Sequence, residues 1–372
     1  MSKSVLEYLV EMVQIDSESL DERAMADYLI KELQQLGGEV REDKANEKTG
    51  GNAGNVIAWF DGKEGIEPLM LNAHMDTVTP GNGVVPDIRG GIMYSAGGTV
   101  LGADDKSGIA MILAVIAQRK KEGNLQVPLE VVFTISEEIG LLGAKELDCS
   151  LLRSKRGYSL DGNKMGELVK ASPSQINYKV TFQGKSVHAG VEPEKGLNAI
   201  VIAADYLRKL PDGRIDEVTT MNIGKIKGGK ATNIVCDEVM IEGEIRSHKE
   251  NKLQSLLELV QKEAESVKEK WKTGVKFEWH TSFKGLQFEE TEDLIEISHE
   301  AFSSLGINQG LVINGGGSDA NALAEHGIRL AVVGTGMQKI HTIEEFIDLE
   351  DLETGYQWLD NILSIWEERC GS

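Results

Sequence analysis

The chain has 372 residues, which is more than one average domain holds and enough for two. It contains 60 acidic and 39 basic residues, giving a formal net charge of −21, and 41% of its residues are hydrophobic. This balance argues against a nucleic acid or an anionic membrane as partner, because both are bound by clustered Lys and Arg. The composition otherwise is that of a globular protein able to bury a core.

Helix and strand patterns alternate in the first half of the chain. Apolar residues at helical spacing predict a helix that ends at Gly37-Gly38 and a second helix at 106–121. Short apolar runs predict strands at 55–60, 68–72, 129–135 and 157–160. The run at 129–135 is almost continuously apolar, which is typical of a strand covered on both faces. Alternation of this kind predicts an α/β sandwich.

The pattern changes near Ser172-Pro173 and returns after Leu286. Between these points the predicted elements are strand 176–184, helix 196–210, strands 219–226 and 233–246, helix 249–272 and strand 275–282. This β-α-β-β-α-β order is that of a ferredoxin-like module. A helix at 320–324, a strand at 329–333 and a last helix to Trp366 then resume the α/β pattern. We therefore expect a smaller domain inserted into a larger one.

The cysteines and the first residues bear on the compartment. Cys149, Cys236 and Cys370 are odd in number and widely spaced, so they indicate neither a disulfide framework nor a zinc motif. The first 20 residues place apolar positions at helical spacing between charges, unlike a signal peptide. No apolar run is long enough to span a bilayer. These features predict a cytoplasmic protein.

Residues of the types that bind metals follow several predicted strands: His74, Asp76, Asp104, Asp105, Glu137, Glu138, Asp161 and His341. Taken singly they are weak signals, because paired acids usually face solvent and Asp is a favoured helix N-cap. Open α/β sheets, however, bind ligands at the carboxyl ends of their strands. Carboxylates gathered there repel one another unless cations neutralise them. Two His with several carboxylates suit Zn²⁺ or a similar divalent ion.

Seven motifs along the chain are AHMDTV (73–78), LGADDKSG (101–108), SEEIGLLGA (136–144), LDG (160–162), GKSVHAG (184–190), GGGSDAN (315–321) and His341. In this order they resemble the co-catalytic metallopeptidase superfamily of peptidase T, carboxypeptidase G, the aminoacylases and succinyl-diaminopimelate desuccinylase. The resemblance covers essentially the whole chain. The Gly-Glu-Leu at 166–168, soon after Asp161-Gly162, is similar to the peptidase T branch.

The resemblance implies a phosphorylase/hydrolase-like α/β/α catalytic domain at 1–173 and 287–372, with an inserted ferredoxin-like α+β lid domain at 174–286. It also implies the roles of the site residues, with Glu137 as general base and a cis peptide bond after Asp104. Asp104 bridges two metals, His74 and Asp161 complete one site, Glu138 and His341 complete the other, and Asp76 supports His74 from behind.

The cofactors implied are two divalent ions, for which Zn suits the ligands best and Co or Mn also fits. Such ions share a water, lower its pKa and polarise a scissile carbonyl, while Glu137 takes the proton and returns it to the leaving amine. The expected activity is that of a metallo-exopeptidase, a hydrolase of short peptides, in particular a tripeptide aminopeptidase.

Three residues of the inserted region and one glycine of the loop at 315–317 are candidates for substrate contact. His188 would stabilise the tetrahedral intermediate, and Arg246 would grip a substrate carboxylate with its bidentate fork. Asn233 and Gly316 would lie against the substrate. Each has a plain alternative: His188 as a surface histidine, Arg246 as the partner of Glu242 or Glu244. Dimeric relatives use the lid domain as their interface, so the resemblance allows a homodimer.

Other substrates stay open at this point. Ser136 stands where the peptidase T motif has Asp, and the segment after Asp76 is shorter and different. Hydrolysis of N-acyl amino acids, or carboxypeptidase or desuccinylase activity on the same site, is therefore an alternative. An inactive binding protein on this fold is a more remote one, since every expected catalytic position is filled.

Overall fold

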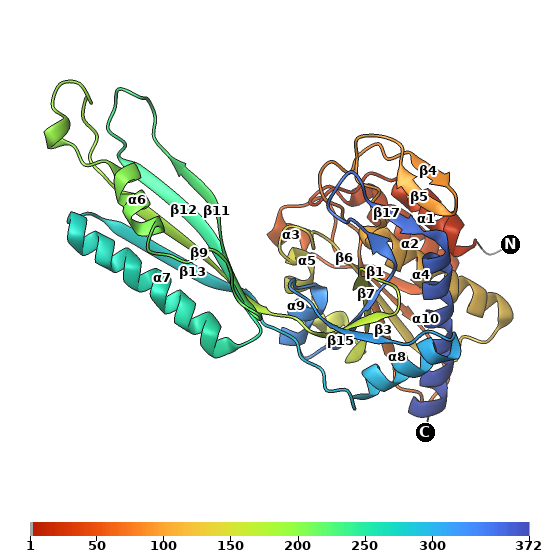
Figure 1. Cartoon of the computed structure of the whole chain (residues 1–372). Coiled ribbons are helices and arrows are strands. Elements are labelled where there is room, and N and C mark those ends of the chain that lie inside the picture. Colours follow the sequence, from red (N-terminus) through yellow and green to blue (C-terminus); the bar gives the residue numbers. More distant parts are fainter. Residues whose placement is uncertain (1–2, 372) are drawn as a thin grey trace. The chain divides into compact units, whose positions relative to one another are not determined.

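The computed structural model describes residues 3–371 and separates into two compact units (Figure 1). Unit 1 comprises the chain up to Lys170, Gln287–Asn314 and the chain from Ser318 onward. Unit 2 comprises Ala171–Leu286 and the three glycines Gly315–Gly317. The units share no sheet, and the chain leaves unit 1 after Lys170, builds unit 2 and returns at Gln287, with Gly315–Gly317 as a second short departure.

Unit 1 contains an eight-stranded mixed sheet in the order β1-β2-β6-β3-β7-β15-β8-β14. The strands are β1 (Glu39–Glu42), β2 (Val56–Phe60), β3 (Leu69–His74), β6 (Leu129–Thr134), β7 (Arg156–Gly162), β8 (Glu167–Ala171), β14 (Gly310–Ile313) and β15 (Arg329–Gly334). The four strands β6, β3, β7 and β15 are parallel. All residues of β3 and β6 are buried, as the near-continuous apolar sequence of β6 predicts for that strand.

The helices of unit 1 pack on this sheet and on one another. They are α1 (Val5–Val13), α2 (Arg23–Gln35), α3 (Asn46–Thr49), α4 (Ala103–Glu122), α5 (Leu142–Lys145), α8 (Asp293–Ser304), α9 (Asp319–Glu325) and α10 (Leu349–Cys370). Helix α4 lies against β3 and β7 and also contacts α1 and α10, so nearly all of it is buried. Helix α9 packs on β15 and α2 packs on β1 and β2. The α/β fold expected for the larger domain is confirmed.

A second, four-stranded sheet completes unit 1 in the order β16-β17-β5-β4. Its strands are β4 (Pro86–Arg89), β5 (Ile92–Ser95), β16 (Met337–Gln338) and β17 (Phe346–Asp348). The sequence did not predict it, because strands of two to four residues carry too few apolar positions to show a period. It joins the segment after Asp76 to the segment around His341.

Unit 2 is a single antiparallel sheet with helices on one face (Figure 1). Its elements are β9 (Ser174–Gln183), α6 (Ala199–Leu207), β10 (Gly213–Asp216), β11 (Thr219–Gly228), β12 (Glu238–Ser247), α7 (Glu250–Trp271) and β13 (Val275–Phe283). Alternate residues of β9, from Ile176 to Phe182, point into the core that α6 and α7 cover. The order β11-β12-β9-β13 is ferredoxin-like, as predicted, and the short β10 is an addition at the edge.

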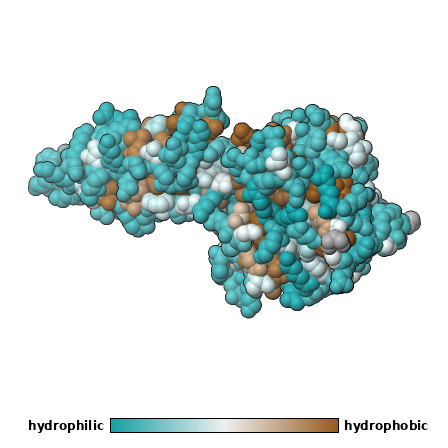
Figure 2. All heavy atoms as spheres, turned by 90° about the horizontal axis from the view of Figure 1, so that it is seen from below, coloured by the Kyte–Doolittle hydropathy of each residue, from teal (hydrophilic) through white to brown (hydrophobic). Residues whose placement is uncertain are grey.

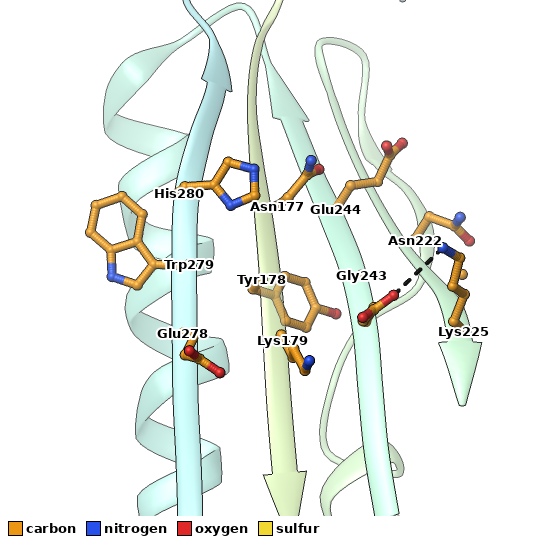
Figure 3. A pocket seen from close by; sticks show the side chains of 12 residues that line it. Asn177, Tyr178, Lys179, Asn222, Lys225, Gly243, Glu244, Glu278, Trp279 and His280 are labelled. Atoms are coloured by element: carbon orange, nitrogen blue, oxygen red, sulfur yellow. Dashed lines mark ion pairs between the residues drawn. The ribbon is translucent and has the colours of Figure 1, made fainter. Parts of the chain in front are cut away.

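The other face of the unit 2 sheet is polar. Figure 3 shows Asn177, Glu244 and His280 side by side on neighbouring strands, with Lys179 and Glu278 in the next row. These residues line a hollow of about 690 Å³. On Figure 2 most of the visible surface of both units is likewise hydrophilic. Within residues 3–371, no helix combines the length and the apolar character needed to cross a membrane.

Candidate metal centre

Parallel strands bring the predicted ligands to one edge of the unit 1 sheet. Strands β6, β3 and β7 are neighbours with the same direction, so their carboxyl ends lie together. His74 is the last residue of β3, Asp161 is next to last in β7, and Glu138 follows β6. The sequence predicted that strand β3 ends at residue 72, which is two residues too early. This edge is where open α/β sheets bind ligands.

Asp104 lies between the two predicted histidine ligands. Its Oδ1 is 3.1 Å from Nε2 of His74, and its Oδ2 is 3.2 Å from Nε2 of His341. Asp161 Oδ1 lies 3.7 Å from the same nitrogen of His74, and Glu138 Oε2 lies 2.9 Å from Nε2 of His341. His74, Asp104 and Asp161 form one group, and Asp104, Glu138 and His341 form a second. Within each group the ligand atoms lie within 4.8 Å of one another. Two groups that share one carboxylate form a candidate dinuclear metal site.

The first turn of α4 presents Asp104 in an unusual way. The peptide bond between Asp104 and Asp105 is cis, as the resemblance implies, and both residues have non-helical backbone angles. Asp105 turns away and accepts a hydrogen bond from the backbone N–H of His74 at 3.3 Å. The predicted helix start at residue 106 therefore marks where regular helical backbone begins.

Burial and mutual repulsion disfavour anions in this cluster. Burial, with the nearby carboxylates, raises the pKa of Glu137 and that of Asp161 well above ordinary carboxyl values. Burial opposes the charged form of His74, yet its contacts with Asp104 and Asp76 raise its pKa well above 6.5. Positive charge is therefore stabilised at the centre of the cluster, which is the environment that a divalent cation requires.

The residues present fit a pair of divalent ions. Among the described residues, the buried Oε1 of Glu138 and Oδ1 of Asp105 have no hydrogen-bond partner. An unpaired buried oxygen costs free energy, and a cation at Glu138 would remove that cost. Two imidazoles and three carboxylates suit zinc and other divalent transition ions alike. The identity of the ion stays a prediction.

Asp76 is fully buried and connects His74 to the glutamate pair. Its Oδ1 is 3.4 Å and its carbonyl oxygen 3.0 Å from Nδ1 of His74, the ring nitrogen that faces away from Asp104. Its carboxylate also accepts hydrogen bonds from the backbone N–H groups of Glu137 at 2.9 Å and Glu138 at 3.3 Å. Asp76 thus orients the imidazole and fixes the backbone that carries both glutamates.

Ser136, where the sequence departs from the peptidase T motif, contacts a buried carboxylate. Oε1 of Glu22 accepts hydrogen bonds from the Ser136 hydroxyl at 2.8 Å, from its N–H at 3.0 Å and from the Leu20 N–H at 2.9 Å. An Asp at this position would place a second carboxylate against Glu22, which is fully buried. Serine at 136 and glutamate at 22 are therefore matched to each other.

Glu345 ties together the segments that carry Asp104 and His341, and the sequence did not reveal it. Its Oε2 accepts hydrogen bonds from the N–H groups of Leu101 at 2.7 Å and Gly102 at 2.9 Å. Its Oε1 accepts from the N–H of Asp104 at 3.0 Å. Glu345 is buried and lies four residues after His341, so one carboxylate holds both segments.

We expect Glu345→Ala to weaken the binding of divalent ions by about 10–100-fold, the usual cost of losing a group that positions metal ligands. Calorimetric titration of the metal-free protein with Zn²⁺ measures this. Glu344→Ala is the matched control, because Glu344 is exposed and pairs with Lys339 at 2.7 Å. Equal affinities for the two variants would contradict the role given to Glu345.

Asp319 is a further buried acid near the site. It stands in the first turn of α9, and its carboxylate accepts a hydrogen bond from the hydroxyl of Thr134, the last residue of β6. Burial raises its pKa to about 6. The sequence placed it in a matched motif but assigned a role only to the glycines there. Asp319 supports the end of β6 a few residues before Glu137.

Within unit 2 the predicted substrate residues form two pairs. His188 and Asn233 come from neighbouring segments, because His188 bridges to Ile234 and the N–H of Ala189 donates to the carbonyl of Asn233 at 2.9 Å. The ring of His188 accepts a hydrogen bond at Nδ1 from the N–H of Gly190 at 3.1 Å. This local contact does not assign the ring a catalytic role. Their roles toward substrate stay predictions.

Arg246 and the glycine loop form the second pair. Nη1 of Arg246 donates to the carbonyl of Gly315 at 3.2 Å, next to Gly316. Its Nε and Nη2 donate to Glu244 at 2.9 and 3.1 Å, which is the pairing that the sequence had held open as the alternative. The guanidinium is thus held in place by three contacts, and its grip on a substrate carboxylate stays a prediction.

Several known proteins are similar to this chain in sequence and in fold. Residues 171–272 match the peptidase dimerisation domain, and residues 55–161 match peptidase family M28. The chain is 39% identical to the uncharacterised protein YqjE of Bacillus subtilis, over 94% of this chain and 95% of that one. The solved structure of aminopeptidase PepT from Bacillus cereus shares 38% identity at a TM-score of 0.88, covering 98% of this chain and 99% of PepT. A tripeptidase from Staphylococcus aureus shares 34% identity at a TM-score of 0.93, covering 99% of each chain.

The fold and the two ligand groups define a hydrolase of the metallopeptidase class with a candidate dinuclear metal site. With 38% and 34% identity over almost the whole length, the chain belongs to the co-catalytic metallopeptidase family that includes peptidase T. The resemblance seen in the motifs is confirmed, and so is the insertion of a smaller domain of the dimerisation type.

Proposed function

We propose that the chain is a metal-dependent exopeptidase that removes the N-terminal residue of tripeptides. The observation that carries this proposal is the pair of ligand groups sharing Asp104, with Glu137 beside them. The similarity to an aminopeptidase and to a tripeptidase, both aligned end to end, supports the choice of substrate.

The residues of the centre divide the work. Two divalent ions, when bound, supply Lewis acidity toward a water and toward the scissile carbonyl. Glu137 takes a proton from the attacking water and delivers it to the leaving amine. Burial and the charge of Asp161 raise the pKa of Glu137 while no cation balances them, and two divalent ions would lower it again so that its carboxylate accepts the proton. Asp76 keeps the glutamate backbone in place.

Residues of unit 2 complete the proposal. His188 would donate to the oxyanion of the tetrahedral intermediate, and Arg246 would bind the carboxylate of the peptide's last residue. Asn233 and Gly316 would contact the part of the peptide between the scissile bond and its C-terminal carboxylate. The match to a peptidase dimerisation domain supports a homodimer formed through unit 2. A cytoplasmic location stays a prediction from the sequence.

The alternative is an enzyme for N-acyl amino acids, or a carboxypeptidase or desuccinylase, on the same centre. Ser136 supports this alternative, because it stands next to Glu137 at a position where the peptidase T motif has Asp. An inactive binding protein is disfavoured, since Glu137 and all five ligand positions are filled.

A substrate panel tests the proposal. The metal-free protein is reconstituted with Zn²⁺, Co²⁺ or Mn²⁺ and assayed on Ala-Gly-Gly, Ala-Gly and N-acetylalanine side by side. We expect release of alanine from the tripeptide at the highest kcat/KM. Cleavage confined to N-acetylalanine would refute the aminopeptidase proposal and favour the alternative.

A further inference from the structure

A small cavity lies beside the metal ligand Asp161, within unit 1. Its volume is about 200 Å³, and the residues that line it are Asp161, Gly162, Asn163, Glu167, Val169, Val312, Ile313, Asn314 and Gly334. It lies where β7 and β15 end and β8 begins, at the sheet edge that carries the candidate metal centre.

The floor of this cavity is backbone. A side chain at Gly334 would bring its Cβ to 1.8 Å from the carbonyl oxygen of Lys164. Only glycine therefore lets the turn that carries Lys164, which leads into Glu167 at the start of β8, lie against the end of β15. This close approach places Glu167 and Asp161 on the lining of the same cavity.

The walls carry two carboxylates, Asp161 and Glu167, and the amides Asn163 and Asn314 beside a small apolar patch. Val169, Val312 and Ile313 are the apolar part, and Ile313 is 66% exposed. Glu167 is paired only weakly: Lys164 Nζ lies 3.3 Å from its Oε1, but the lysine side chain is 69% exposed. Exposed pairs of this kind contribute about 0–1 kcal/mol, so another cation can replace the lysine. Asp161, by contrast, belongs to a metal-ligand group.

The size of the cavity limits what it accepts. Whole-ligand pockets usually measure about 300–1,000 Å³, so 200 Å³ takes one end of a substrate rather than all of it. An occupant would sit next to Asp161 and hence next to the reacting bond. A carboxylate beside a small apolar patch suits the α-ammonium group of a residue whose own side chain is short and apolar.

Building on the proposed function, we propose that Glu167 binds the α-ammonium group of the first residue of the peptide. The apolar wall then takes that residue's side chain, and the carbonyl that follows reaches the metal centre. Glu167 is in this view the residue that makes the enzyme select a free N-terminus. The Gly-Glu-Leu segment that resembles the peptidase T branch would owe its glutamate to this task.

Three matched substrates test this inference: Ala-Gly-Gly, its analogue without the amine, propanoyl-Gly-Gly, and Lys-Gly-Gly. In Glu167→Gln we expect KM for Ala-Gly-Gly to rise about 10-fold or more, the loss of one charged hydrogen bond, with kcat nearly unchanged. KM for propanoyl-Gly-Gly should stay as in the wild type. Lys164→Gln, which removes the competing cation, should leave KM for Ala-Gly-Gly unchanged or lower it.

The dependence on pH gives a second readout. An α-amino group loses its proton near pH 8, so KM of the wild type for Ala-Gly-Gly should rise above that pH. The rise should be absent in Glu167→Gln. Metal content of two ions per chain in each variant shows that the centre itself is intact.

Two results would overturn the inference while leaving the proposed function standing. One is tripeptide cleavage with an unchanged preference for Ala-Gly-Gly over propanoyl-Gly-Gly in Glu167→Gln. The other is a loss restricted to Lys-Gly-Gly, which would assign Glu167 to a side-chain ammonium. A wild type that hydrolyses N-acetylalanine and none of the three peptides would instead remove the proposed function, and this inference with it.

Discussion

Replacing Glu137 by Gln is expected to lower kcat by about 10²–10⁴-fold, the usual contribution of a general base. Glutamine keeps the shape of the side chain but cannot take a proton from water. The backbone N–H of residue 137 would still donate to Asp76, so the local structure should persist. Steady-state assays at saturating concentration of a peptide that the wild type hydrolyses measure the decrease in kcat.

Metal content separates the base from its neighbour. Glu137→Gln should retain two ions per chain, because His74, Asp104, Asp161, Glu138 and His341 are untouched. Glu138→Gln should lose affinity for an ion, since Oε2 of Glu138 lies 2.9 Å from His341 in a ligand group. Unchanged turnover in Glu137→Gln would remove Glu137 from the role of base.

Replacing Asp104 by Ala is expected to abolish activity down to the rate without enzyme and to remove both ions. Asp104 has one oxygen beside His74 and the other beside His341, so both groups lose a ligand at once. Contacts with the two histidines hold the pKa of Asp104 below the ordinary carboxyl range despite burial. The variant therefore also removes the most strongly anionic carboxylate of the cluster. Calorimetric titration with Zn²⁺ measures the loss.

His341→Ala is the comparison for Asp104→Ala. It removes a ligand from one group only and leaves the group of His74, Asp104 and Asp161 complete. We therefore expect one ion to bind to His341→Ala and none to bind tightly to Asp104→Ala. Binding of two ions to Asp104→Ala would show that this residue does not bridge.

Much of the fold could be predicted because periodic apolar patterns are local. The six buried residues of β6 and the alternating residues of β9 identify one strand covered on both faces and one covered on a single face. The strands β4, β5, β16 and β17 escaped, since they are short and their pairing joins residues near 90 to residues near 345. Nothing in either segment alone indicates the other.

The candidate site shows the same division. Residues in motifs, such as His74 and Asp161, could be named from the sequence, and the structure brings them together. Glu345 could not, because its partners at 101–104 lie more than 240 residues away and adjacent acids usually face solvent. Glu22 was hidden for the same reason, as its contact with Ser136 depends on the packing of α2.

The central claim is that two divalent ions bind at the ends of the unit 1 strands and share Asp104. Crystals of the zinc-loaded protein, measured at the zinc absorption edge, test it directly. We predict two anomalous peaks per chain, one among His74, Asp104 and Asp161 and the other among Asp104, Glu138 and His341. A single peak, or peaks away from Asp104, would contradict the account.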